Sequence, residues 1–206
     1  MNEPLNPYAP PKSKVDGADP ELSAAGAHSF YAVGIRKYYL MYFCTFGLYA
    51  IYWMYRNWKA QKERAGADVW PVPRGLFLIF FLHSLFGRVE QKLTSGGQRF
   101  EGSANGLATG IVAIVICNAI FGQVALRAPV NLIWIVVVAI AAIVLQAPLF
   151  AKAQRNINAA CGDPDGATNS GMTLANWTWA AICLAYNLWI WSFSLAAITK
   201  AQAGLG

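Results

Sequence analysis

Five hydroxyl groups and one guanidinium recur at helical spacing in the first third of the chain. In alternating steps of four and three residues they are Tyr38, Tyr42, Thr45, Tyr49, Tyr52 and Arg56. In one continuous helix this spacing would place all six on a single face. Hydroxyl groups that face lipid tails lack hydrogen-bond partners, so we expect this hydroxyl stripe to face protein. It would then be either a packing seam against other helices or a polar lining for a lipid headgroup or a small solute.

Two amide side chains lie deep inside long uncharged stretches. Asn118 is near the middle of the stretch 102–126, and Asn187 is near the middle of the stretch 166–199. An amide surrounded by hydrocarbon needs a partner and can hold helices together. We expect both side chains to turn inward as contacts between helices. A substrate site at the midplane of a membrane is the alternative.

The residue types that usually carry catalysis form no recognisable set. The four cysteines have no metal-ligand spacing, and His83 is the single histidine inside an apolar segment. The sequence contains neither a nucleophile-elbow motif nor a phosphate-binding glycine motif. The segment 162–166, GDPDG, is interpreted as a turn, because it lacks the remaining ligands of a calcium loop. We therefore predict no enzymatic activity, no metal and no cofactor.

Composition places the chain in a membrane. Charged residues make up 13% of the 206 residues and hydrophobic residues 56%, whereas soluble domains carry roughly 25% charged residues. These figures exclude a soluble globule, a disordered chain and a disulfide scaffold. The net charge of +6 does not indicate nucleic-acid binding, because the basic residues flank apolar segments. The protein is expected to be polytopic.

Uncharged stretches define the elements that must position these side chains. A spanning helix needs about 20 apolar residues, which predicts four full spans over about 38–55, 107–126, 130–150 and 174–198. The segment 75–87 is apolar on every side but short. It is either a short span flanked by arginines that reach the interface or a re-entrant half-span packed on protein. The predicted fold is all-α, a polytopic membrane helix bundle with four full spans plus one short inserted or re-entrant helix.

The distribution of lysine and arginine predicts an orientation. Residues 1–29 have the composition of a disordered, proline-containing polar tail, followed by a helical domain over 30–206. With four crossings, ten basic residues lie on the side of the loop 56–74 and six lie on the other side. The positive-inside rule then makes the loop cytoplasmic and the tail external. Anionic lipid headgroups are expected at Arg56, Lys59, Lys62, Arg64 and Arg74.

One segment resembles a known family. Residues 45–58, TFGLYAIYWMYRNW, are similar to the motif T-[FL]-G-[LI]-Y-x-x-Y-W-x-Y-[KR]-N-W of a family of small bacterial membrane proteins of unknown function. The segments FYAV at 30–33 and WPVPRGLF at 70–77 also resemble that family, and the likeness covers about residues 30–90. It implies a multi-pass protein of the bacterial inner membrane and carries no activity with it.

Three classes of function follow from these observations. The leading interpretation is a non-catalytic membrane component, namely a scaffold, an accessory subunit or a lipid-organising protein, with a protein partner or a second copy of itself. The first alternative is a small oligomeric transporter or channel that uses the hydroxyl stripe and the two asparagines. The second is a membrane enzyme acting on lipids, which the absence of an acid, base, nucleophile or metal cluster in the sequence disfavours.

Overall fold

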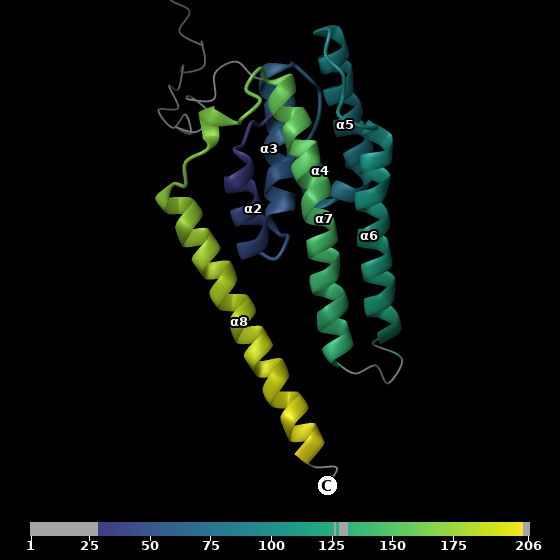
Figure 1. The fold of residues 1–206 in the computed structure, drawn as a ribbon, viewed down its shortest axis with the longest axis vertical. Helices are drawn as coiled ribbons and strands as arrows, with labels where there is room; N and C mark the ends of the chain where they lie inside the picture. The colour runs from purple at the N-terminus through teal and green to yellow at the C-terminus, as the bar shows by residue number, and fades with distance from the viewer. Residues whose placement is uncertain (1–28, 126, 128–131, 204–206) are drawn as a thin grey trace, which may run out of the picture.

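All the regular secondary structure in the described part of the chain is helical. The computed structural model describes residues 29–125, 127 and 132–203, so the predicted tail over 1–29 lies outside the described residues except for Ser29. The described elements are α2 (Ile35–Cys44), α3 (Tyr49–Arg64), α4 (Pro71–Leu76), α5 (Leu78–Ser95), α6 (Ala104–Ala125), α7 (Leu132–Ala160), the 3-10 turn η1 (Ala167–Asn169) and α8 (Leu174–Ala203) (Figure 1). The all-α class is confirmed. Among the described residues, two helices, α6 and α7, are long and apolar enough to cross a membrane, so four full spans are not confirmed.

The segment 38–55, predicted as one span, is two helices joined by a tight turn. Phe46 and Gly47 have φ angles of 51° and 84°, in the left-handed region that ends a helix. The Thr45 hydroxyl sits inside the turn and accepts a 2.9 Å hydrogen bond from the Tyr49 N–H. Helices α2 and α3 consequently lie side by side as a hairpin (Figure 1). The prediction of a single helix is wrong. Phe46 and Gly47 reverse the direction of the chain, although the apolar pattern of the sequence continues across them.

The short apolar segment 75–87 falls within α4 and α5. The guanidinium carbons of Arg74 and Arg88, which flank it, lie 4.2 and 5.4 Å from the centroid of the Trp58 ring. A segment whose two flanking arginines reach one ring is packed against protein and does not carry the chain across the bundle. That the segment is re-entrant in a membrane stays a prediction.

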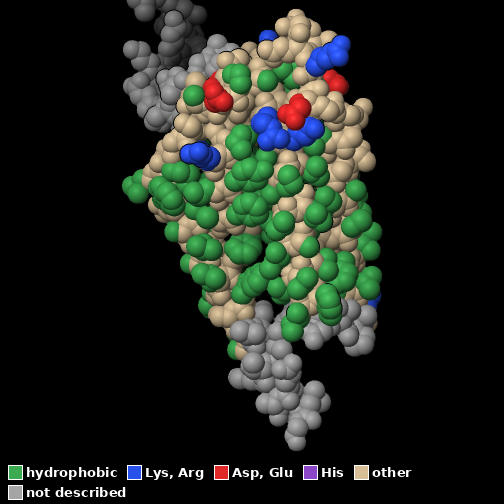
Figure 2. Space-filling model, in the orientation of Figure 1, with side chains coloured by type: hydrophobic (Ala, Val, Ile, Leu, Met, Phe, Trp, Pro, Cys, Tyr) green, Lys and Arg blue, Asp and Glu red, His purple; other side chains and the backbone are tan. Residues whose placement is uncertain are grey.

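Hydrogen bonds gather the helix ends into one polar end of the molecule. Gln61 near the end of α3 donates to the Ser29 carbonyl and accepts from Arg88 of α5, while Lys37 of α2 donates to Asn169 of η1. The basic residues of 36–37, 56–64, 88–99 and 152–155 therefore lie at or near this end, and Arg127 lies in the loop between α6 and α7 at the other. Figure 2 shows charged side chains over this end and hydrophobic side chains below it.

Helix α8 stands apart from the rest of the bundle. It packs mainly against α2, and in Figure 1 it begins far from α7 and slants toward the lower end of that helix. Large side chains are exposed on several of its sides, including Trp177, Trp189 and Phe193. A helix that is apolar all round and unburied by its own chain is suited to contact with lipid.

The loop before α8 is built around the predicted turn 162–166. Asp163 accepts hydrogen bonds from the backbone N–H groups of Ala167 and Thr168, at 2.8 and 3.0 Å, which confirms the turn. Gly166 has a φ of 64°, and a Cβ atom there would lie 2.4 Å from the carbonyl of Val33. The loop is therefore pressed directly against the backbone of the segment that precedes α2.

Comparing two glycines of this loop tests that close approach. Gly162 also has a positive φ, of 72°, but a Cβ atom added there meets nothing within 4 Å. We expect Gly162→Ala to lower the free energy of unfolding by about 1–2 kcal/mol, the cost of a left-handed alanine. Gly166→Ala should cost several kcal/mol more, because the loop must also move away from Val33. Thermal unfolding in detergent measures both, and equal losses would contradict the close approach.

Candidate functional site

The centre of the polar end is an extended, buried stretch of backbone. Residues 29–34, here called the buried segment, lie between α3, α7 and η1. The side chains of Phe30, Tyr31, Ala32 and Val33 are no more than 5% exposed. This stretch is neither helical nor paired in a sheet. Its N–H and C=O groups must therefore find partners among side chains.

Five amide side chains supply these partners, and we call them the amide cradle. They are Asn57 and Gln61 of α3, Gln154 and Asn158 of α7, and Asn169 of η1. Asn158 makes two hydrogen bonds to the buried segment. Its Oδ1 accepts from the Val33 N–H at 3.1 Å, and its Nδ2 donates to the Val33 carbonyl at 2.9 Å. This two-way pairing imitates the contact that a neighbouring β-strand would make.

The other members of the cradle extend the pairing along the buried segment. Asn57 accepts from the Tyr31 N–H at 3.1 Å, and Gln154 donates to the Tyr31 carbonyl at 3.2 Å. Asn169 donates to the Ala32 carbonyl at 3.0 Å. Gln154 also donates to Asn158 at 2.6 Å, so the amides orient one another. A buried network that is satisfied in this way fixes one arrangement of the helices around it.

Sequence reasoning missed the amide cradle, although it left a signal. Asn57 and Gln61 are four residues apart, and so are Gln154 and Asn158. Each pair thus lies on one face of its helix, next to a run of charged residues. Two uncharged amide pairs at this spacing indicate two helices that share an extended segment of backbone.

Removing one amide tests whether the cradle holds the fold. Asn158→Ala leaves the N–H and C=O of Val33 without partners, at about 1–3 kcal/mol for each buried group. We expect the free energy of unfolding in detergent to fall by about 2–5 kcal/mol. Asn105→Ala, a change of the same chemistry at an exposed position of α6, should lower it by less than about 0.5 kcal/mol. Equal losses of stability in the two variants would show that the amide cradle does not stabilise the fold.

The thiol of Cys161 gives an independent readout of the same docking. It is 7% exposed and lies 3.6 Å from the Phe30 carbonyl, and burial raises its pKa to about 12. Because the thiolate is the reactive form, alkylation at pH 8 should be very slow in a variant that retains Cys161 alone. Adding Asn158→Ala should accelerate alkylation by at least about tenfold through release of Phe30. An unchanged rate would mean that the segment stays docked without the cradle.

The hydroxyl stripe is divided between the two helices of the hairpin, and most of it meets in the core. The Tyr38 ring stacks on Tyr42 at 5.9 Å and meets Tyr49 edge-on at 5.4 Å. Those three rings and Thr45 are no more than 3% exposed. Their side chains therefore form contacts between α2 and α3, the arrangement expected of a packing seam, rather than one face of one helix.

The last two members of the stripe lie nearer the polar end. Tyr52 is 39% exposed, and its hydroxyl accepts a hydrogen bond from Arg56 at 2.5 Å. The Arg56 guanidinium also lies 4.5 Å from the centroid of the Tyr31 ring. Arg56 is only 4% exposed, so its position differs from that of an arginine displayed to lipid headgroups. It packs the buried segment onto α3.

The two asparagines of the uncharged stretches do not come together. Asn187 donates a 2.8 Å hydrogen bond to the Cys183 carbonyl, one turn earlier in its own helix α8. Asn118 is half-buried on α6, and among the described residues its side chain has no hydrogen-bond partner.

His83 of α5 forms a hydrogen bond to another helix, with its Nε2 lying 3.0 Å from the Thr109 hydroxyl of α6.

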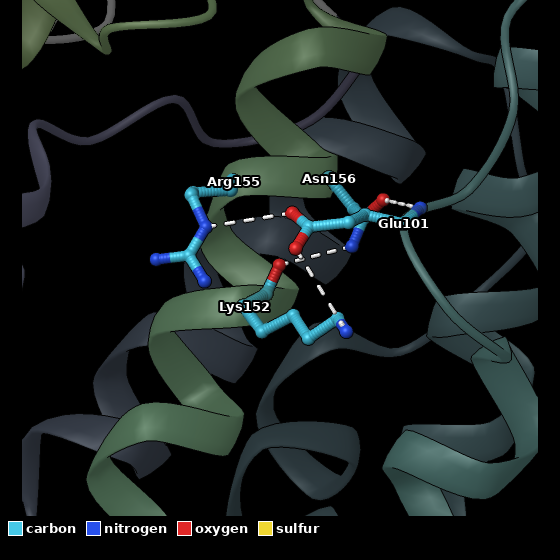
Figure 3. Close-up of polar contacts among 4 residues, drawn as sticks. All are labelled: Glu101, Lys152, Arg155 and Asn156. Atoms are coloured by element: carbon cyan, nitrogen blue, oxygen red, sulfur yellow. Dashed lines mark hydrogen bonds and ion pairs between the residues drawn. The ribbon is translucent and has the colours of Figure 1, made fainter.

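An acidic residue of the loop between α5 and α6 gathers two basic residues of α7 (Figure 3). The Glu101 carboxylate lies 3.8 Å from Lys152 Nζ and 3.5 Å from Arg155 Nε. The Glu101 backbone N–H donates to Asn156 at 2.6 Å. All three charged side chains are at least a third exposed, so these ion pairs contribute little stability. The single carboxylate offsets one of the two positive charges that it contacts.

A mostly apolar groove opens on the side of the molecule, between the α3–α4 pair and α8. Its volume is about 680 Å³. It is lined by Met41, Leu48, Tyr49, Ile51, Tyr52, Tyr55, Val72, Gly75, Leu76, Ala175, Asn176 and Trp179. Two members of the hydroxyl stripe, Tyr49 and Tyr52, thus reach this lateral groove. Close packing of α4 on α3 shapes its floor, since a Cβ atom on Gly75 would lie 2.9 Å from that of Tyr55.

Comparison with known proteins adds no assignment to this geometry. No protein-family model, curated protein or solved structure matches the chain. The resemblance of residues 30–90 to a bacterial membrane family therefore stays a prediction. Within the described residues, no group of three or more histidine, cysteine, aspartate or glutamate side chains is placed to hold a metal ion.

Proposed function

We propose that the protein is an integral membrane protein with a non-catalytic role, which binds and organises lipid through the lateral groove. The groove itself carries this proposal. It is concave and mainly apolar, and its volume of about 680 Å³ falls in the range of sites that hold small molecules. One of its walls is α8, whose own surface is exposed and apolar. An acyl chain is the ligand that suits these walls.

The proposed membrane arrangement has α6, α7 and α8 as crossing helices. The first two have the required length and apolarity, and α8 has 30 residues, enough for about 45 Å of helix. The hairpin of α2 and α3 and the pair α4–α5 enter from the polar end and return to it. Because basic residues concentrate on the cytoplasmic side of membrane proteins, the polar end would face the cytoplasm of a bacterial cell.

This arrangement changes one part of the orientation expected from sequence. If α2 and α3 form a hairpin, the chain before α2 and the loop 56–74 emerge on the same side. The tail then lies on the cytoplasmic side with the loop, rather than opposite it. Of the fourteen basic residues in the described part of the chain, twelve then fall on the side of the loop 56–74, and Arg127 and Lys200 fall on the other.

The transporter alternative depends on a polar site near the midplane. Its two candidate residues would have to face one another or a common space. Asn187 bonds to its own helix, and no hydrogen bond joins it to Asn118 among the described residues. No specific observation therefore favours a transporter over a lipid-binding component.

Cysteine labelling from the two sides of the membrane tests the topology. Single cysteines replace Ala65, Ser95, Ala167 and Arg127, all exposed positions, in a chain without its native cysteines. We expect an impermeant maleimide to label the first three from the same side and position 127 from the other. Labelling of positions 65 and 95 from opposite sides would show that the α4–α5 pair crosses the membrane.

Filling the lateral groove tests the proposed activity. Ala175 lines the groove from α8, whereas Ala181 lies on the same helix, is exposed and is outside the groove. Ala175→Phe should reduce the lipid that co-purifies with the protein by at least about threefold, since the added ring occupies the space of an acyl chain. Ala181→Phe should leave it unchanged. Native mass spectrometry counts the bound lipid, and equal retention by both variants would refute acyl-chain binding in the groove.

A further inference from the structure

Two arginines share one aromatic ring at the junction of α3, α4 and α5. The Arg74 guanidinium lies 4.2 Å from the centroid of Trp58 and 4.9 Å from that of Phe81. The Arg88 guanidinium lies 5.4 Å from the centroid of Trp58. Both arginines are half-buried, and the Trp58 side chain that they contact is fully buried. Rings of this kind attract cations, and here they hold two like charges close together.

The cluster contains many hydrogen-bond donors and few acceptors. Each guanidinium has five N–H donors and the indole has one, and none of these groups accepts. Arg88 donates to Gln61 Oε1 at 3.3 Å. Among the described residues Arg74 has no hydrogen bond or ion pair, and the buried Trp58 Nε1 has no partner. An oxygen-rich group is what this set of donors lacks.

No carboxylate offsets the two positive charges. Within the described part of the chain, neither Arg74 nor Arg88 forms an ion pair, in contrast to Lys152 and Arg155, which share Glu101. Glu90 is two residues from Arg88 and therefore points away from it on α5. The pKa of Arg74 is lowered, first by burial and then by the charge of Arg88. Both effects disfavour the charged guanidinium, and the negative charge of a bound anion would offset them.

The position of the cluster indicates which anion would reach it. Arg88 touches Gln61, which holds the buried segment at the polar end, and Trp58 lies one turn before Gln61 on α3. In the proposed orientation this is the level at which the apolar surface meets the headgroups of the cytoplasmic leaflet. A phosphate at this depth would meet two guanidiniums, whose planar forks suit phosphate oxygens.

We infer that Arg74 and Arg88, supported on the Trp58 ring, form a binding site for the phosphate group of an anionic phospholipid. The phosphate chemistry follows from the cluster alone, and the lipid source rests on the proposed function. The site also explains why two arginines flank the apolar segment 75–87. They converge on one headgroup instead of marking the two faces of a membrane.

Lipid binding by matched charge variants tests this site. The protein in detergent is titrated with phosphatidylglycerol, with diacylglycerol and with glycerol 3-phosphate, and bound ligand is counted by native mass spectrometry. We expect Arg74→Gln and Arg88→Gln each to weaken phosphatidylglycerol binding by about tenfold, the effect of losing one charge-assisted contact. Arg36→Gln removes one exposed charge of the same end and should change binding by less than about twofold. Diacylglycerol binding should be the same in all four proteins.

The three ligands separate the ways in which the inference can fail. If Arg36→Gln weakens phosphatidylglycerol binding as much as Arg74→Gln, the effect is the general charge of the polar end and the site is refuted. If the arginine variants lose diacylglycerol equally, they have damaged the fold or the groove, and the site is again refuted. Binding of glycerol 3-phosphate as tightly as phosphatidylglycerol, with the same dependence on Arg74, would overturn the lipid source. If Ala175→Phe loses diacylglycerol binding and the arginine variants keep it, the result supports acyl-chain binding in the groove and leaves the arginine site to be judged by phosphatidylglycerol binding.

Discussion

The arrangement of the polar end depends on side-chain amides that replace a missing β-strand. The buried segment 29–34 has no partner strand, yet Tyr31, Ala32 and Val33 are almost completely removed from solvent. Asn57, Gln154, Asn158 and Asn169 supply the bonds that a strand would have supplied. An unpaired backbone group in this position costs about 1–3 kcal/mol, so the helices that carry the amides cannot separate without exposing several such groups at once.

This constraint explains the polar surroundings of an otherwise apolar protein. The buried segment draws the ends of α3 and α7 together, and η1 closes over it through Asn169. Lys37 and Arg56, although charged, are 3% and 4% exposed because they pack around that segment. Basic residues further out, such as Lys62, remain exposed. Burial therefore divides the positive charges of one end into a structural set and a surface set.

The sequence predicted the helical class and the apolar stretches, but not the course of the chain through them. The spacing of apolar and hydroxyl residues indicates which side chains are buried. The same spacing continues through the turn at Phe46 and Gly47, because both helices of the hairpin bury residues of the same kind. The segment 38–55 has the length of a membrane span because the two helices of the hairpin together form one uninterrupted apolar stretch. The amide cradle could not be derived from local pattern, because its partners are brought together only by the fold.

The hydrogen bonds of the buried segment join parts of the chain that are far apart in synthesis. Val33 pairs with Asn158 across 125 residues, and Ala32 pairs with Asn169 across 137. Contacts of such long range form late, because the intervening chain must exist before it can be closed into a loop. Residues 29–34 leave the ribosome early and must wait until α7 and η1 have been made. This early segment is therefore among the last of the described residues to reach its final place.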